Sequence, residues 1–254
     1  MTSNILIGVL LGLIIFLYGI ENFSREIIGT SGSRFRKLLG KSTSNRFNAT
    51  VLGTFVTAIL QSSTATTLIA VSLVSSGLIS FANSLGIIFG ANIGTTITAQ
   101  LVAFKITKFA PVFIIFGFLF SLFGDKFRFL GKGVFYFGLL FWGLNLIGEA
   151  VQPIKENPDI INALGSLSNV FVSLGAGVLL TALVQSSSVT TGIIIVVAAS
   201  GLITLEQAVP FLFGTNIGTT ITTIIGSLRM NSYAKRAAVA HSIFNIFGVI
   251  LFML

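Results

Sequence analysis

The sequence contains no cysteine and very little charge. The absence of cysteine excludes a disulfide bond, a thiol nucleophile and a cysteine metal site. Charged residues make up 9% of the 254 positions and hydrophobic residues 54%, whereas soluble domains average roughly 25% charged residues. We therefore expect an all-α integral membrane protein that crosses the lipid bilayer of the cell membrane several times.

Acidic residues are also few, so the formal net charge is +8. The basic residues lie in short segments between the apolar stretches. This placement is what the positive-inside rule produces in membrane proteins, and it argues against a nucleic-acid partner.

One polar stretch occurs twice inside this apolar sequence. Residues 61–67 read QSSTATT, and residues 185–191, which follow 124 positions later, read QSSSVTT. Without a gap, residues 53–98 and 177–222 are identical at 22 of 46 positions. Gln, Asn, Gly and Thr are among the identities, and a shared apolar composition does not bring these residues into register. The sequence is therefore an internal duplication, with repeat 1 at residues 1–124 and repeat 2 at residues 125–254.

In each repeat the Gln-Ser-Ser motif divides an apolar segment into two short arms. About 20 helical residues are needed to cross the ~30 Å hydrocarbon core. Residues 48–76 and 170–200 therefore predict two re-entrant helical hairpins, because non-helical backbone at membrane depth must be buried in protein or line a wet cavity. The alternative is two full spans in each place, with the hydroxyls bonded to their own helices.

A second motif is also repeated, as GANIGTT at residues 90–96 and GTNIGTT at residues 214–220. Two glycines around an asparagine, followed by threonines, predict a break in a helix with the threonines near the start of the next segment. We therefore expect one broken transmembrane helix in each repeat.

The distribution of basic residues predicts the orientation of the repeats. One span, one hairpin and two further spans give each repeat three crossings, so the second repeat must be inverted relative to the first. The expected cytoplasmic segments, 24–46, 125–132 and 229–236, then hold six, three and three of the 15 Lys and Arg residues. This positive-inside bias supports two inverted-topology repeats with both termini outside. Two full spans in place of each hairpin would give the same parity.

The motif stretches contain no Lys, Arg, Asp, Glu or His, although a proton relay normally needs a titratable group at membrane depth. Hydroxyl, amide and carbonyl oxygens suit an alkali cation, and helix N-termini suit a small oxyanion. Inverted repeats with interrupted helices are typical of secondary transporters. The sequence therefore favours one transport domain for sodium-coupled anion uptake. It shows no nucleophile–base pair or metal cluster in the membrane core, so we expect neither an enzyme nor a cofactor.

These motifs carry a resemblance to a known family. The two Gln-Ser-Ser stretches, the two Asn-Ile-Gly-Thr stretches, AHSIFN at residues 240–245 and FLYG at residues 16–19 resemble the type II sodium/phosphate cotransporter family. The resemblance covers about residues 11–248. It implies Na⁺-driven transport of inorganic phosphate by alternating access, with Na⁺ as the coupling ion, and it is compatible with a homo-oligomer.

The resemblance also implies the residues of the site. Phosphate would lie between the two hairpin tips, at Gln61, Ser62, Ser63, Gln185, Ser186 and Ser187. Sodium would be held by oxygens near Ser63, Thr64, Thr66, Asn92, Thr95, Ser187, Ser188, Thr190, Asn216 and Thr219.

One departure from the family concerns the C-terminal motif. Electrogenic animal members carry a His followed by an Asp in repeat 1, where this sequence has Gly117 and Phe118 at the positions equivalent to His241 and Ser242. The resemblance therefore does not set the Na⁺ stoichiometry. We interpret His241 and Asn245 as structural hydrogen-bonding residues that contact the neighbouring repeat. The alternative functions are a carrier of another small oxyanion, such as sulfate or arsenate, a passive anion channel, and a phosphate sensor that does not transport.

Overall fold

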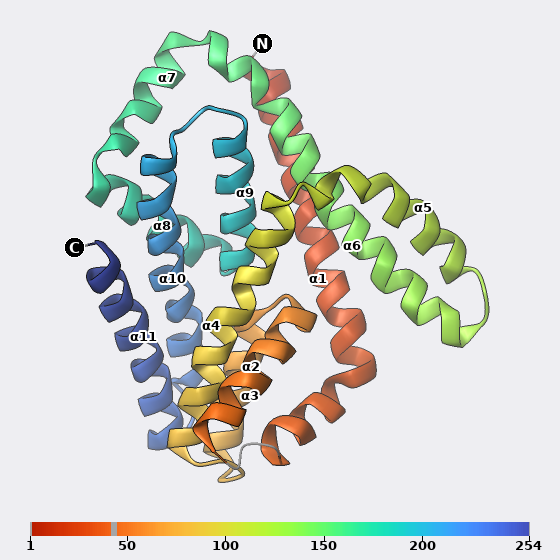
Figure 1. Ribbon diagram of the computed structural model, residues 1–254, viewed down its shortest axis with the longest axis vertical. Helices are drawn as coiled ribbons and strands as arrows, with labels where there is room; N and C mark the ends of the chain where they lie inside the picture. The colour runs from red at the N-terminus through yellow and green to blue at the C-terminus, as the bar shows by residue number, and fades with distance from the viewer. Residues whose placement is uncertain (1, 42–44, 254) are drawn as a thin grey trace. The chain divides into compact units, whose positions relative to one another are not determined.

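Long apolar stretches separated by short polar turns form helices along the chain (Figure 1). The computed structural model describes residues 2–41 and 45–253, and no strand occurs within them. The helices, with η for 3₁₀ turns, are α1 (Thr2–Lys41), α2 (Arg46–Leu60), α3 (Ser63–Ser75), α4 (Phe81–Ala103), η1 (Ile106–Phe109), α5 (Ala110–Ser121), α6 (Asp125–Ala150), η2 (Gln152–Glu156), α7 (Pro158–Gly165), η3 (Ser166–Ser168), α8 (Val170–Val184), α9 (Ser187–Ala199), α10 (Leu205–Ser227) and α11 (Ser232–Met253).

Among residues 2–41 and 45–253, five helical segments are long and apolar enough to cross a membrane. They are Asn4–Gly29, Phe81–Ala103, Phe127–Glu156, Leu205–Ser227 and Ser232–Met253. Their exposed residues include many large apolar side chains, as expected for surfaces that face lipid. The prediction of an all-α, multi-pass membrane protein is confirmed.

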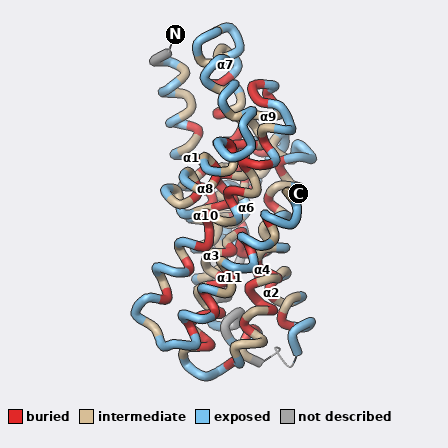
Figure 2. Tube along the Cα trace, turned by 90° about the vertical axis from the view of Figure 1, so that its left-hand side faces the viewer, coloured by how far each residue is buried: buried red, intermediate tan, exposed pale blue. Residues whose placement is uncertain are grey.

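α5 is shorter than these segments. Its 12 residues give a helix of about 18 Å at 1.5 Å per residue, less than the ~30 Å hydrocarbon core. The crossing that the inverted arrangement requires here stays a prediction. The polar connector expected before the second motif forms η2, α7 and η3, and α7 is mostly exposed (Figure 2).

The duplication extends to the helix boundaries. α8, α9 and α10 begin and end 124 residues after α2, α3 and α4, respectively. The turns repeat as well, because Gly77 and Gly201 both have a φ of 73°. Each predicted hairpin region thus consists of two short helices that meet at its Gln-Ser motif.

The residue at each of these junctions has a left-handed backbone. Gln61 has a φ of 52° and Gln185 a φ of 58°. This conformation is uncommon for a non-glycine residue and costs of order 1–3 kcal/mol, so the surrounding structure must hold it in place. After Gln61 the chain enters α3, which packs against α2 (Figure 1).

The two predicted helix breaks are wrong. α4 and α10 continue without interruption through both Asn-Ile-Gly-Thr motifs. Their glycines instead allow close packing, because a Cβ on Gly90 would overlap the carbonyl oxygen of Thr50 in α2, and one on Gly214 would overlap that of Leu174 in α8. Small residues permit such close approach between helices in membranes, where lipid supplies no hydrophobic force to bring them together.

The helices form two compact units, each of which draws segments from both repeats. One unit consists of residues 1–30, 99–173 and 191–209. The other, which we call the motif unit, consists of residues 31–98, 174–190 and 210–254. The predicted division between repeats after residue 124 describes the duplication of the sequence, and it stays a prediction as a domain boundary.

The close packing of α2 on α4 gives a direct stability prediction. Gly90→Ala should destabilise the protein by about 1–3 kcal/mol, because the added methyl group meets backbone atoms that cannot rotate away. Gly248→Ala in α11 is the matched control, because a Cβ there meets nothing within 4 Å. Thermal unfolding in detergent should show a clear loss for Gly90→Ala and none for the control. Equal midpoints for the two variants would contradict the proposed packing.

Candidate functional site

Gln61 is the polar centre of the first motif. Its side chain is only 5% exposed. Its Oε1 accepts a hydrogen bond from Thr98 Oγ1 of α4 at 2.6 Å, and its Nε2 donates to the carbonyl oxygen of Ala58 at 2.6 Å. Because a buried amide without partners is costly, these two bonds stabilise the left-handed end of α2 against α4.

The next residues join α2 to the start of α3. Ser62 is the N-cap of α3, and its hydroxyl accepts from the backbone N–H of Ala65 at 3.2 Å. The Thr57 hydroxyl of α2 donates to Thr66 Oγ1 at 2.9 Å, and Thr66 donates to the Ser62 carbonyl oxygen at 3.2 Å. The two arms are thus linked by side chains, and the N-terminus of α3 lies at the tip, where backbone N–H groups of the first turn lack helical partners.

The second motif has the same backbone but fewer internal bonds. Gln185 is exposed, whereas its counterpart Gln61 is buried. The hydroxyl groups of Thr181 and Thr222 are buried without a hydrogen-bond partner among the described residues. They are the counterparts of Thr57 and Thr98, which are both bonded in the first motif. Polar groups that are satisfied internally in repeat 1 are therefore open in repeat 2.

Three serines predicted to bind ligands are buried, and their hydroxyls make no internal bond. Ser63, Ser187 and Ser188 are 7%, 5% and 3% exposed. No side-chain hydrogen bond of these serines occurs in the part of the chain that the structure describes. They are available to a bound ion without the loss of an existing bond.

The candidate sodium ligands on α4 differ from their counterparts on α10 in burial and hydrogen bonding. The Nδ2 atom of Asn92 is buried without a partner among the described residues, whereas Asn216 is exposed. Thr95 donates to the Ala91 carbonyl oxygen of its own helix at 2.9 Å, and Thr219 is 4% exposed. In the described chain no three His, Asp or Glu side chains gather as metal ligands. The oxygen atoms that could coordinate a cation at the motifs therefore belong to hydroxyl, amide and carbonyl groups.

All the residues predicted for the site lie within the motif unit. These are Gln61, Ser62, Ser63, Thr64, Thr66, Asn92, Thr95, Gln185, Ser186, Ser187, Ser188, Thr190, Asn216 and Thr219. Ser186 repeats the role of Ser62, since its hydroxyl accepts from the Val189 N–H at 3.4 Å. Their roles in binding phosphate or sodium stay predictions.

Sequence reasoning missed the threonines that surround the two glutamines. Thr57 and Thr98, with their counterparts Thr181 and Thr222, are identical polar residues in register within the duplicated window. This identity in register is the sequence signal that could have identified these threonines. The structure adds the contact of Thr98, whose hydroxyl donates to Gln61.

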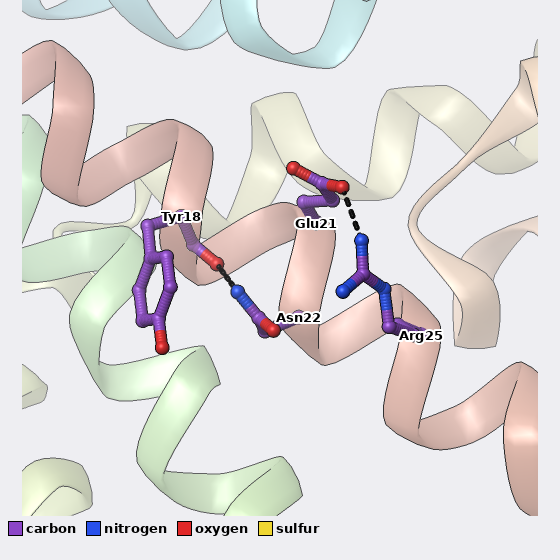
Figure 3. Close-up of polar contacts among 4 residues, drawn as sticks. All are labelled: Tyr18, Glu21, Asn22 and Arg25. Carbon is purple, nitrogen blue, oxygen red and sulfur yellow. Dashed lines mark hydrogen bonds and ion pairs between the residues drawn. The ribbon is translucent and has the colours of Figure 1, made fainter.

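A polar cluster on α1 is local to its helix. The Asn22 carboxamide donates to the Tyr18 carbonyl oxygen at 2.8 Å, and Arg25 forms an ion pair with Glu21 at 2.6 Å (Figure 3). Both contacts join residues four positions apart, and the ion pair is largely exposed. Exposed pairs of this kind contribute little to stability, and we assign this cluster no part in a binding site.

The fold and the motif geometry define a class of protein, a polytopic all-helical membrane protein with a duplicated, uncharged polar motif. Comparison with known protein families identifies the family of this chain. The family described as Na+/Pi-cotransporter matches residues 15–149 and 158–253, so the chain belongs to this family of transporters, which is not a family of enzymes. It is accordingly a multi-pass protein of the cell membrane.

Relatives include proteins that match most of this chain. "Uncharacterized protein YqeW" of Bacillus subtilis is 32% identical over 245 residues, which is 94% of this chain and 78% of that protein. "Putative inorganic phosphate export protein YjbB" of Escherichia coli K12 is 27% identical over 98% of this chain, but this chain covers only 46% of its length. "Sodium-dependent phosphate transport protein 2B" of Homo sapiens is 33% identical over 50% of this chain and 20% of that protein. No solved structure matches.

The different bonding of the two motifs gives a stability prediction. Thr98→Val should destabilise the ligand-free protein by about 1–3 kcal/mol, because it leaves the buried Oε1 of Gln61 without a donor. The matched change Thr222→Val removes a hydroxyl that has no partner, so it should leave the stability nearly unchanged. Unfolding of both variants in detergent, without phosphate or sodium, checks the difference. A loss for Thr222→Val as large as that for Thr98→Val would contradict it.

Proposed function

We propose that this protein is a sodium-coupled carrier of inorganic phosphate that works by alternating access. The observation that carries the proposal is the set of hydroxyls without internal partners at two uncharged motifs in one compact unit, those of Ser63, Ser187 and Ser188 at the tips and the buried ones of Thr181 and Thr222 beside them. A buried polar group without a partner is costly in an apolar environment. A bound ion that supplies the missing contacts would remove this cost.

The phosphate site consists, on this proposal, of the first residues of α3 and α9 and the residues just before them. Helix N-termini attract anions through their free N–H groups and their dipole. Serine hydroxyls and glutamine amides add donors that replace the water around the oxyanion. The residues are Gln61, Ser62, Ser63, Gln185, Ser186 and Ser187.

Sodium would bind next to the phosphate, where hydroxyl, amide and carbonyl oxygens gather. These are hard ligands that suit an alkali cation. They would come from Ser63, Thr64, Thr66, Asn92, Thr95, Ser187, Ser188, Thr190, Asn216 and Thr219, with the free Thr222 hydroxyl as an addition from the structure. The family's description names both ions, and the name of the Homo sapiens relative states sodium dependence.

The membrane arrangement follows from helix lengths and charge. α2 and α3 have 15 and 13 residues, which gives about 20 Å each at 1.5 Å per residue. Neither arm reaches across ~30 Å of hydrocarbon, and this favours re-entrant hairpins over pairs of full spans. The positive-inside bias favours repeats of inverted orientation, which is the architecture that alternating access uses in many secondary transporters.

Export is a second candidate for the direction of transport. The observation that favours it is the match of almost the whole chain to a relative whose printed name refers to phosphate export. The basic segment of residues 24–46, cytoplasmic in the proposed topology, would attract phosphate from that side. Export would use the same site, with the phosphate gradient rather than the sodium gradient setting the direction.

Uptake of ³²P-labelled phosphate into proteoliposomes tests the proposal. With an inward Na⁺ gradient, phosphate should accumulate above equilibrium, and with K⁺ in place of Na⁺ it should not. Equal downhill flux in both salts would indicate a passive channel, and binding without flux would indicate a sensor. Inhibition of phosphate uptake by added sulfate or arsenate shows which oxyanions the site accepts. Efflux of phosphate from vesicles loaded with it measures export.

Ser187 offers a sharp test of the binding site. Ser187→Ala should weaken phosphate binding by about 1–3 kcal/mol, or roughly 5- to 150-fold, because it removes a ligand from a buried site. Stability without ligand should not change, because this hydroxyl makes no internal bond. Ser84→Ala is the control, since Ser84 is also buried but bonds to its own helix at the Phe81 carbonyl oxygen. Unchanged phosphate affinity in Ser187→Ala would rule out the assigned site.

A further inference from the structure

The first arm that carries the motif, α3, is joined by polar contacts to two helices of the other repeat. Thr67 Oγ1 of α3 lies 3.4 Å from Thr223 Oγ1 of α10, and Thr223 Oγ1 lies 3.3 Å from His241 Nδ1 of α11. All three side chains are at most 2% exposed. Near the other end of α3, Asn231 donates from Nδ2 to the Ser75 carbonyl oxygen at 2.8 Å. α3 is thus held at its middle and at its C-terminus.

One arrangement of protons is consistent with all of these contacts. With the Thr67 hydroxyl proton on the Thr64 carbonyl oxygen at 3.1 Å, Thr223 donates to Thr67 and accepts from His241. We therefore expect Nδ1 of His241 to be protonated and Nε2, which is buried without a partner among the described residues, to carry no proton. A neutral ring agrees with a site where no carboxylate of the described chain pairs with it.

The chain from Thr67 to Thr223 and His241 has no equivalent around α9. The counterparts of Thr223 and His241, 124 residues away, are Ala99 and Gly117. Alanine and glycine offer no side-chain donor or acceptor, so Thr191, the counterpart of Thr67, has no equivalent chain of partners.

The end of α9 also differs from the end of α3. Thr107 stands at the position of Asn231, and Thr107 and Ala199 line an open cavity of about 290 Å³ in their own unit. At the equivalent place in repeat 1, Asn231 bridges directly to α3. In the described chain no hydrogen bond joins Thr107 to Ala199.

We propose that Thr223 and His241 are positioning residues that anchor the first motif, and that the second motif has no such anchor. They act through Thr67, one turn from the candidate ligands Ser63 and Thr64. The anchor prepares the first tip for its ligand, whereas the arm at α9 lacks these polar links. The effect on transport rests on the proposed function; the anchor itself does not.

Nitrogen NMR tests the anchor without any transport assay. His241 is the only histidine, so ¹⁵N-histidine labelling in detergent gives the signals of a single ring. The wild type should show the Nδ1-protonated tautomer. Thr223→Val, which keeps the shape but removes the hydroxyl, should change the Nδ1 signal, and Thr223→Ser should restore it. An Nε2-protonated ring, or a spectrum that Thr223→Val leaves unchanged, would overturn the proposal.

Amide hydrogen exchange tests the difference between the two motifs. In the ligand-free wild type, residues 61–67 should exchange more slowly than residues 185–191. Thr223→Val should speed exchange at residues 61–67 alone. Ser227→Ala is the control, because Ser227 is buried on the same helix and bonds only to the Ile224 carbonyl oxygen. Equal protection of the two motifs in the wild type would overturn the proposal.

Transport then connects the anchor to function. Thr223→Val should weaken phosphate affinity roughly tenfold, as expected when about one buried hydrogen bond no longer organises a site, and Thr223→Ser should restore it. Unchanged affinity in Thr223→Val would overturn the positioning role. If the wild type itself shows no sodium-driven flux, the proposed function fails, while the NMR and exchange results still decide whether the anchor exists.

Discussion

The structure depends on one physical constraint, the cost of leaving a buried hydroxyl or amide without a hydrogen-bond partner in an apolar environment. Repeat 1 meets this constraint internally, since Gln61 bonds to Thr98 and Thr57 bonds to Thr66. Repeat 2 has the same residue types at the same offset but leaves Thr222 unpartnered. Two duplicated sequences thus differ in their bonding, because Gln61, Thr57 and Thr98 are bonded in repeat 1 whereas Thr181 and Thr222 of repeat 2 are buried without a partner among the described residues.

Glycine packing makes these polar contacts geometrically possible. Gly90 brings α4 so close to α2 that a methyl group would overlap backbone atoms. On the same two helices the Thr98 hydroxyl reaches the amide of Gln61, at 2.6 Å. The left-handed backbone does not depend on this bond, because Gln185 has the same conformation without it. The bond instead satisfies the buried amide of Gln61 and links the tip of the first arm to α4.

Much of this fold could be predicted from sequence, because the signals that specify it are local. The apolar runs predicted the spans, and the duplicated Gln-Ser motif located the junctions at Gln61 and Gln185. The predicted breaks in α4 and α10 were wrong because a glycine has two uses, to relax a helix or to let another helix approach. Only the neighbouring backbone, such as Thr50 beside Gly90, distinguishes them. The link between Thr67 and Thr223, 156 residues apart, could not be predicted, since it depends on tertiary packing.

The sequence differences between the repeats bear on how a duplicated carrier could work. Alternating access needs two states of similar free energy that ligands shift by binding one more tightly. If both arms were held by buried hydrogen bonds of about 1 kcal/mol each, each movement would have to break them. With the Thr223–His241 anchor only beside α3, movement of the arm at α9 would break no equivalent chain of hydrogen bonds. A ligand that supplies partners to Ser187 and Thr222 would then favour the closed state of that arm, and the unsatisfied polar groups of repeat 2 would couple binding to the conformational change.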